Sequence, residues 1–165
     1  MKSIDNINNL NKSDFLTIFG NVFEKTDWVA EKVFELKPFK DFNDFSSKMF
    51  GLYESAQKKN ILIILNSHPE LAVAKKLTFE SKSEQAGAKL NECSVKEFDE
   101  FKKLNLEYKN KFGFPFIIAV KGKNKNEILN NFRQRILNDI ESEFEEAKNQ
   151  VKKIATFRLN EIINQ

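Results

Sequence analysis

Residues 61–72 read Ile-Leu-Ile-Ile-Leu-Asn-Ser-His-Pro-Glu-Leu-Ala and place the only histidine of the chain directly after an apolar run. The run 61–65 must be buried, because it has no polar side to present to water. Pro69 then turns the chain, since the residue before a proline is disfavoured in helical geometry. A buried segment therefore delivers His68 to a turn at the rim of a core, where reactive side chains are often presented. The alternative, which the spacing alone favours, is a surface histidine in a loop.

Length and composition indicate one globular domain. The chain has 165 residues, of which 41% are hydrophobic and 31% are charged, the balance of a chain that folds around a core. Five glycines and three prolines are few, which favours helices with short connections over a sandwich or a barrel. We therefore predict a single domain over residues 1–165.

Charge and rare residues exclude several classes of protein. The net charge of +3 comes almost entirely from lysines interspersed with glutamates, a pattern typical of solvated helix faces and not of a nucleic-acid reader. One cysteine and one histidine permit no internal disulfide and no His/Cys metal cluster within the chain. No apolar run approaches the roughly 18 residues of a membrane span. We expect no metal, no nucleic-acid partner, no membrane partner and a cytoplasmic location.

The spacing of apolar residues predicts an all-α bundle of about eight helices with one short extended segment. Residues 60–66 could also be a buried strand, but helix is preferred because no partner strands are evident nearby. The ranges with helical character are 13–23, 27–36, 44–56, 60–66, 70–76, 81–90, 94–112, 124–136 and 141–163.

Several of these helices carry recognisable end signals. Ser81, Ser94 and Asn124 are each followed three residues later by glutamate, which is the capping-box pattern of a helix start. Ser13 is predicted to cap the first helix, and Gly113 is predicted to end the helix that Ser94 begins.

Residues 114–120 are the predicted extended segment, because seven apolar residues with an internal proline are too short for a helix. Its buried N–H and C=O groups need partners. They either pair with loops and ordered water, or they hydrogen-bond a flat polar ligand.

Arg158 lies on the apolar side of the last predicted helix, whose inward positions are Phe144, Ala147, Val151, Ile154, Arg158 and Ile162. A guanidinium keeps its charge when it is buried, so Arg158 should meet an anion. That anion could be an internal carboxylate or the carboxylate of a substrate. The side chain could also reach water from the edge of the stripe.

Glu84 and Gln85 open a predicted helix whose next residues, Ala86-Gly87-Ala88, are small. The local pattern favours Glu84 as the capping partner of Ser81. The functional alternative is an anion bound at this helix N-terminus, where free N–H groups and the positive end of the helix dipole meet.

Together, these motifs resemble the OHCU decarboxylase family. Members act on 2-oxo-4-hydroxy-4-carboxy-5-ureidoimidazoline, the last intermediate between urate and allantoin. The resemblance extends from about residue 15 to residue 159. The segments that carry it are His-Pro-Glu-Leu-Ala at 68–72, Leu77-Thr78 with Glu80-Ser81, Glu84-Gln85-Ala86-Gly87, Leu104-Asn105 with Tyr108, Lys-Phe-Gly-Phe-Pro-Phe-Ile-Ile at 111–118, and Arg158.

This resemblance implies a cofactor-independent carboxy-lyase that converts an anionic ureido-imidazoline to (S)-allantoin, often as a homodimer. His68 and Glu84 would be catalytic, with His68 handling proton transfer. Two alternatives are a helical homologue that binds a ureido-imidazoline without turning it over, and the same chemistry on a related ureido-imidazoline. The substrate-binding set implied is Pro69, Ser81, Lys82, Ser83, Glu84, Gln85, Phe116, Ile117, Ile118, Ala119, Val120 and Arg158.

Overall fold

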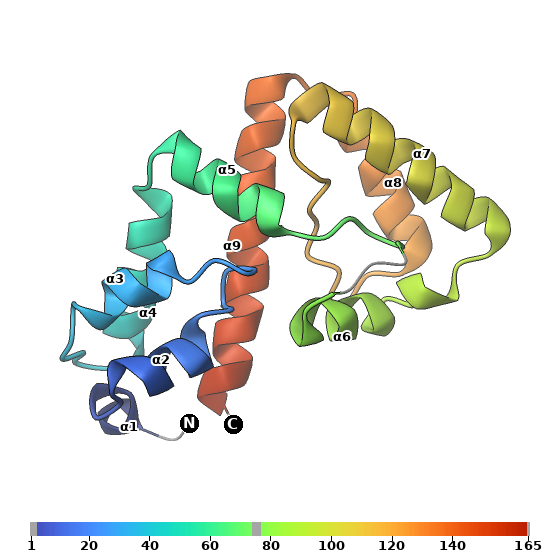
Figure 1. Ribbon diagram of the computed structural model, residues 1–165. Coiled ribbons are helices and arrows are strands. Elements are labelled where there is room, and N and C mark those ends of the chain that lie inside the picture. Colours follow the sequence, from blue (N-terminus) through green and yellow to red (C-terminus); the bar gives the residue numbers. More distant parts are fainter. Residues whose placement is uncertain (1–2, 74–76, 165) are drawn as a thin grey trace. The chain divides into compact units, whose positions relative to one another are not determined.

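The computed structural model describes residues 3–73 and 77–164, and over these residues the chain is all-α, without a strand (Figure 1). The predicted fold class is confirmed. None of the described helices is both long enough and apolar enough to cross a membrane. The elements are α1 (Ile4–Asn8), α2 (Lys12–Phe19), α3 (Trp28–Phe34), α4 (Phe42–Glu54), α5 (Lys58–Ser67), α6 (Phe79–Gly87), the 3₁₀ turn η1 (Leu90–Glu92), α7 (Val95–Phe112), α8 (Lys125–Arg135) and α9 (Ile140–Asn164).

The chain divides into two compact units, each with its own core. The first unit takes the residues up to Ser67 together with those from Lys152 onward, and the second unit is His68–Val151. α9 is one continuous helix that supplies its first turns to the second unit and its remaining turns to the first (Figure 1).

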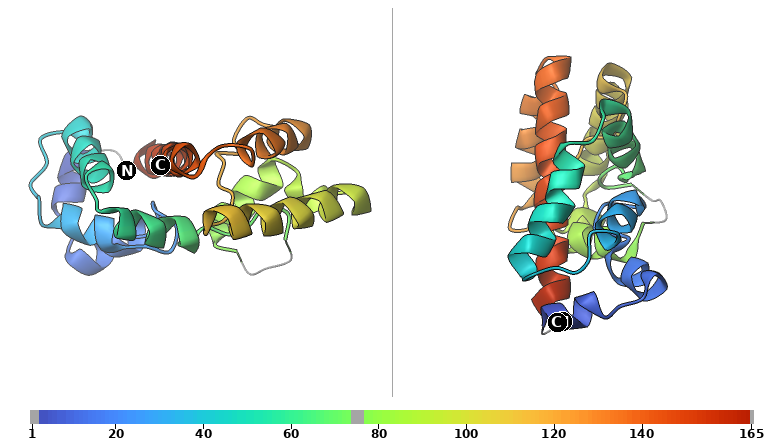
Figure 2. Two further views of the ribbon diagram at one scale, coloured as in Figure 1. Left: turned by 90° about the horizontal axis from the view of Figure 1, so that it is seen from above. Right: turned by 90° about the vertical axis from the view of Figure 1, so that its left-hand side faces the viewer.

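The core of the first unit is built from phenylalanines on α2, α3 and α4. These three helices pack together, as Figure 2 shows. Phe15, Phe19 and Phe45 are fully buried or nearly so. The ring centroids of Phe15 and Phe19 lie 4.8 Å apart, and those of Phe19 and Phe45 lie 5.0 Å apart. Tilted aromatic contacts at these distances add to the stabilisation from burial.

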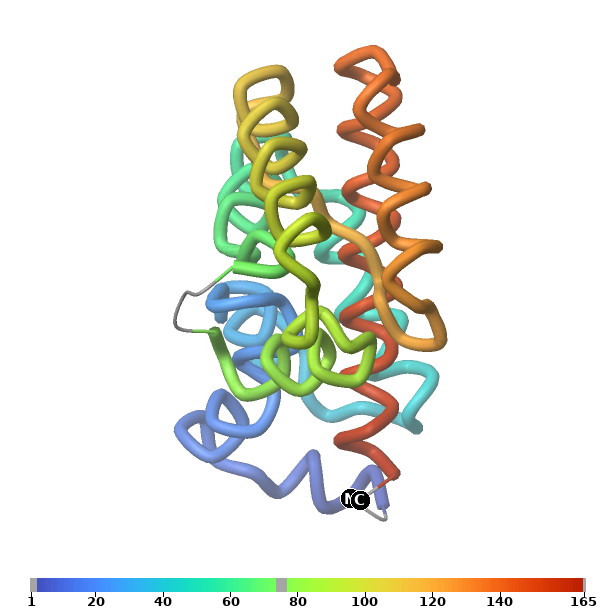
Figure 3. Tube along the Cα trace, turned by 90° about the vertical axis from the view of Figure 1, so that its right-hand side faces the viewer, coloured from blue at the N-terminus to red at the C-terminus, as the bar shows by residue number. Residues whose placement is uncertain are grey.

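The core of the second unit forms where α7 and α8 lie side by side (Figures 1 and 3). Phe116 stacks on Phe132 with ring centroids 3.8 Å apart. Tyr108 packs edge-on against both rings, at 5.3 Å from Phe116 and 5.7 Å from Phe132. The extended segment that contains Phe116 therefore packs against α7 through Tyr108 and against α8 through Phe132.

Three of the predicted helix-end signals are confirmed. α7 and α8 begin with the predicted capping boxes at Ser94 and Asn124. Gly113 ends α7 in the left-handed region with a φ of 79°, a conformation that glycine adopts without steric cost.

Three local predictions are wrong. Residues 70–73 form a turn and irregular backbone instead of the start of a helix at 70–76, whose residues 74–76 lie outside the described chain. α6 is capped by Thr78, whose hydroxyl accepts the Ser81 N–H at 3.2 Å, so Ser81 lies inside the first turn and is not the cap. α2 is capped by Asn11 and not by Ser13. In both helices an equally good capping side chain occurs slightly earlier in the sequence.

We predict that Gly113→Ala lowers the free energy of unfolding by about 1–2 kcal/mol, the cost of a side chain in left-handed geometry. Space is not the cause, because a Cβ at this position would meet nothing within 4 Å. Gly51→Ala is the matched control, since Gly51 lies inside α4 with the same open space. It should instead stabilise by about 0.5–1 kcal/mol. Urea unfolding of both variants measures the difference, and equal effects would contradict the conformational explanation.

Candidate active site

His68 follows the last residue of α5 directly and is the first residue of the second unit. Only 8% of its surface is exposed, so it is not the surface histidine of the alternative interpretation. The preceding apolar run is helical, with Ile61, Ile64 and Leu65 buried. The prediction that a buried segment delivers the imidazole to a turn is confirmed.

The turn after His68 is held by side chains from α6 and α7. Gln85 accepts the Ala72 N–H through Oε1 at 3.2 Å and donates from Nε2 to the Glu70 carbonyl at 3.3 Å. Asn105 donates from Nδ2 to the Leu71 carbonyl at 3.0 Å. Ala72 has a φ of 52°, which costs about 1–2 kcal/mol for a residue with a Cβ. These bonds from distant side chains explain why no helix forms here.

α6 presents the predicted polar side chains on two different faces. Ser81 and Gln85 are buried at 3% and 7% exposure, and Glu84 is partly buried beside them. Lys82 and Ser83 are exposed. A pocket of about 650 Å³ is lined by Lys82 together with Gln85 and Phe98. The structure therefore groups Ser81, Glu84 and Gln85 on the inner side of α6, as residues three and four positions apart must be.

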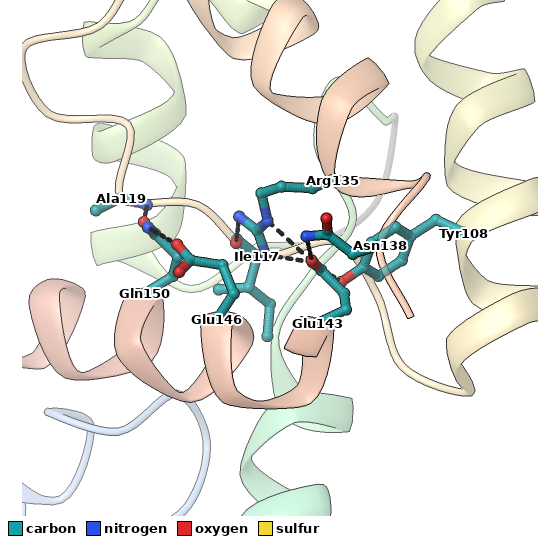
Figure 4. Close-up of polar contacts among 8 residues, drawn as sticks. All are labelled: Tyr108, Ile117, Ala119, Arg135, Asn138, Glu143, Glu146 and Gln150. Carbon is teal, nitrogen blue, oxygen red and sulfur yellow. Dashed lines mark hydrogen bonds and ion pairs between the residues drawn. The ribbon is translucent and has the colours of Figure 1, made fainter. Parts of the chain in front are cut away.

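Residues 116–120 are extended and buried, as predicted. The Val120 carbonyl accepts the Lys123 N–H at 3.0 Å, but two other main-chain groups pair with side chains, which the sequence interpretation did not consider. Arg135 donates from Nη1 to the Ile117 carbonyl at 2.7 Å. The Ala119 N–H donates to Oε1 of Gln150 at 2.9 Å. Both contacts are shown in Figure 4.

A buried polar network continues from Arg135 (Figure 4). The fully buried carboxylate of Glu143 accepts from Nε and Nη2 of Arg135 at 2.9 and 2.6 Å, and from Nδ2 of Asn138 at 2.9 Å. Tyr108 donates its hydroxyl to the same carboxylate at 2.5 Å. Burial and this neighbouring carboxylate raise the pKa of Tyr108, so the residue stays a phenol and a hydrogen-bond donor.

Sequence reasoning missed this network, although the signal was present. Arg135 follows Ile128 and Phe132 at helical spacing on the buried side of α8, just as Arg158 lies on an apolar stripe. Its guanidinium also lies 4.4 Å from the ring centroid of Phe116. A buried guanidinium must meet an anion, so the position of Arg135 predicts a carboxylate partner, as that of Arg158 does, and this partner is Glu143.

Arg158 belongs to the first unit, where it meets an internal carboxylate. Its Nη2 lies 2.9 Å from Oε2 of Glu24, and the two side chains are 4% and 0% exposed. Nη1 also donates to the Asn21 carbonyl at 3.1 Å. The internal carboxylate was one of the alternatives that the sequence left open. Across the described residues, no group of three His, Cys, Asp or Glu side chains could hold a metal ion.

Comparison with known proteins gives consistent matches. A family model described as OHCU decarboxylase matches residues 8–160. The Uric acid degradation bifunctional protein of Bacillus sp. (strain TB-90) is 38% identical over the whole chain, and PucL of Bacillus subtilis, which has the same description, is 35% identical. The chain spans about a third of the length of these two proteins. The 2-oxo-4-hydroxy-4-carboxy-5-ureidoimidazoline decarboxylase of Haloferax volcanii is 33% identical over 96% of this chain and 95% of its own.

Two solved structures share the fold. A crystal structure of (S)-allantoin synthase has a TM-score of 0.78 at 24% identity and covers 98% of this chain and 54% of its own. A crystal structure of OHCU decarboxylase in the presence of (S)-allantoin has a TM-score of 0.74 at 20% identity and covers 94% of this chain and all of its own. The family model and the Haloferax relative each extend over nearly the whole sequence. The chain therefore belongs to the OHCU decarboxylase family.

Proposed function

We propose that the protein decarboxylates 2-oxo-4-hydroxy-4-carboxy-5-ureidoimidazoline to (S)-allantoin in urate degradation. The observation that carries the proposal is a family match over residues 8–160 in a chain whose only histidine is buried at the start of a turn fixed by side-chain hydrogen bonds. A histidine is the side chain best suited to move protons near neutral pH.

The proposed substrate carries its own electron sink. Its carboxylate is attached to a ring carbon next to a C=N bond, so the electron pair released with CO₂ moves toward that bond. The ring nitrogen of that bond takes up a proton. The ring hydroxyl on the same carbon loses its proton and becomes the ketone, and the neighbouring carbon takes up a proton on one face. The protein therefore has to hold the anion, manage the hydroxyl proton and control the face of protonation, and it needs no organic cofactor as electron sink.

His68 is proposed to take the proton of the ring hydroxyl, with Glu84 either orienting the imidazole or binding the ureido nitrogens. General acid–base catalysis of this kind contributes about 10²–10⁴-fold. Gln85 is proposed to contact the ring. Each primary amide offers two N–H groups and two acceptor lone pairs. Among the described residues, Gln85 uses one of each in its bonds to Glu70 and Ala72.

The remaining predicted contacts are proposed from the family resemblance. The main chain of 116–120 would hold the flat ring, with the Ile117 carbonyl and the Ala119 N–H already bonded within the protein. Arg158 would bind the substrate carboxylate. Pro69, Ser81, Lys82 and Ser83 complete the set.

We further propose that residues 1–165 act as one domain, because the matched residues 8–160 run through both compact units. A homodimer in the cytoplasm is proposed from the same resemblance. Sedimentation velocity at several protein concentrations tests the oligomeric state, and a monomer at all of them would reject the dimer.

The deciding experiment couples urate oxidation and hydroxyisourate hydrolysis to this protein and follows the optical activity of the allantoin formed. The expected result is faster formation of allantoin with an excess of the S enantiomer. Racemic product at the spontaneous rate would reject the enzyme. If such a protein still bound allantoin, the non-catalytic homologue would be the better description.

Arg158→Lys tests the proposed anion contact without leaving Glu24 opposite an empty site. Lysine keeps the positive charge but loses the bidentate guanidinium geometry, so we predict about a tenfold increase in KM, equivalent to about 1.4 kcal/mol, with kcat little changed. Arg133→Lys is the matched control, because Arg133 is half exposed and pairs with Glu100 at the surface. Steady-state kinetics of both variants are compared, and an unchanged KM in Arg158→Lys would restrict Arg158 to its pairing with Glu24.

A further inference from the structure

The motif Leu104-Asn105 with Tyr108 has no role in the reaction described above, yet both polar side chains lie in the core of the second unit. Asn105 is 4% exposed and Tyr108 is fully buried. They are three residues apart on α7, so they share one face of that helix. Tyr108 belongs to the network around Glu143, whereas Asn105 reaches the turn after His68.

Asn105 makes one hydrogen bond and leaves one polar atom unsatisfied. Its Nδ2 donates to the Leu71 carbonyl, while its Oδ1 is buried with no hydrogen-bond partner among the described residues. A buried polar atom without a partner costs about 1–3 kcal/mol. A leucine of similar volume would avoid that cost but would leave the Leu71 carbonyl without this donor. The asparagine therefore serves the turn after His68 while one of its own atoms stays unsatisfied, and such exceptions are expected at functional sites.

The bond from Asn105 completes a set of contacts along three consecutive residues. Gln85 holds the main chain of Glu70 and Ala72, and Asn105 holds that of Leu71 between them. Ala72 is in the left-handed region, a conformation that persists only where the surroundings enforce it. The backbone path that leads out of His68 and Pro69 is thus set by side chains of α6 and α7.

We propose that Asn105 is a positioning residue that fixes the orientation of the His68 imidazole through the Leu71 carbonyl. The expected effect on kcat rests on the proposed function, whereas the expected effect on the orientation of the imidazole does not. A displacement of about 1 Å in a catalytic group can reduce the rate by about 100-fold. Asn105 should accordingly affect kcat more than KM.

The test uses Asn105→Ala and the nearly isosteric Asn105→Asp, which covers the case in which the alanine variant does not fold. Asn131→Ala is the matched control, because the amide of Asn131 likewise donates to a main-chain carbonyl, that of Glu127 in α8. Because the chain has a single histidine, a long-range ¹H–¹⁵N spectrum contains the imidazole signals of His68 alone. These signals report the environment of His68 without any need for activity.

For Asn105→Ala we expect shifted His68 signals and a kcat reduced by about 10- to 100-fold, with KM within about twofold of the parent protein. Asn105→Asp should behave alike at a pH high enough to ionise its carboxyl, because an ionised carboxylate cannot donate to a carbonyl. Its activity relative to the parent should recover as the pH falls and the carboxyl is protonated. A purely structural residue would lower stability without moving the imidazole signals.

Unchanged His68 signals and unchanged kcat in a folded Asn105 variant, as expected for Asn131→Ala, would overturn the inference. A parent protein that gives only racemic allantoin would overturn the proposed function instead. In that case the imidazole spectra would still decide whether Asn105 positions His68.

Discussion

His68→Asn should lower kcat by about 10²–10⁴-fold, the usual contribution of general acid–base catalysis, while the fold is kept. Asparagine can hydrogen-bond but does not exchange protons near neutral pH. It also tolerates the backbone before Pro69, because it carries no branched Cβ. The exposed fraction of His68 is only 8%, and a small polar replacement leaves little strain there. Coupled turnover assays and far-UV circular dichroism measure the two quantities separately.

The control for this variant is Asn66→Ala, two residues earlier on the exposed side of α5. Asn66 bonds only locally, to the Leu62 carbonyl, so activity should stay within about twofold of the parent. Full turnover by a folded His68→Asn protein would reject His68 as the proton-transfer group. Loss of the folded signal in His68→Asn alone would instead assign the imidazole a structural role.

The features that could be predicted correctly from the sequence are those decided by residues close together in the chain. The starts of α7 and α8 were correct because both members of each capping box lie within one turn of the helix. The burial of 116–120 followed from the apolar side chains themselves. Such signals need no knowledge of which distant segments will meet.

The features that the sequence left open or assigned wrongly depend instead on residues far apart. Residues 70–73 read as helix because nothing local opposes it, but their main-chain groups are taken by Gln85 and Asn105 from later helices. The partner of Arg158 is Glu24, at the other end of the chain. In each case the deciding contact joins residues far apart in sequence. Composition likewise does not reveal the two clusters of contacts into which the chain divides.

The same long-range contacts decide how the candidate site is held. His68 and the extended segment carry the proposed chemistry, but polar side chains on α6, α7, α8 and α9 hold their backbone. Burying these polar groups is unfavourable unless each charge is paired. They can be buried here because Glu143 accepts hydrogen bonds from three residues, which are Arg135, Tyr108 and Asn138.

Arg135→Met should therefore lower the free energy of unfolding by about 3–5 kcal/mol, the cost of leaving a buried carboxylate without its charged partner. Methionine fills much of the same volume, so lost packing contributes little. Arg133→Met is the matched control two residues earlier in α8. Its pair with Glu100 is half exposed, so its removal should cost about 0–1 kcal/mol. Urea denaturation of both variants at neutral pH measures the difference.

Glu143→Gln added to Arg135→Met should restore part of the lost stability, because the neutral amide no longer needs a cation. Its carbonyl oxygen can still accept from Tyr108. The double variant should thus be more stable than Arg135→Met alone. With Glu143→Gln measured alone as well, the double-mutant cycle should give a coupling energy of about 1–3 kcal/mol. Activity should nevertheless stay reduced, because the Ile117 carbonyl still lacks the donor that Arg135 supplied. A double variant that regains full turnover would show that Arg135 stabilises the unit without positioning residues 116–120. Additive losses of stability would contradict the ion pair as the cause.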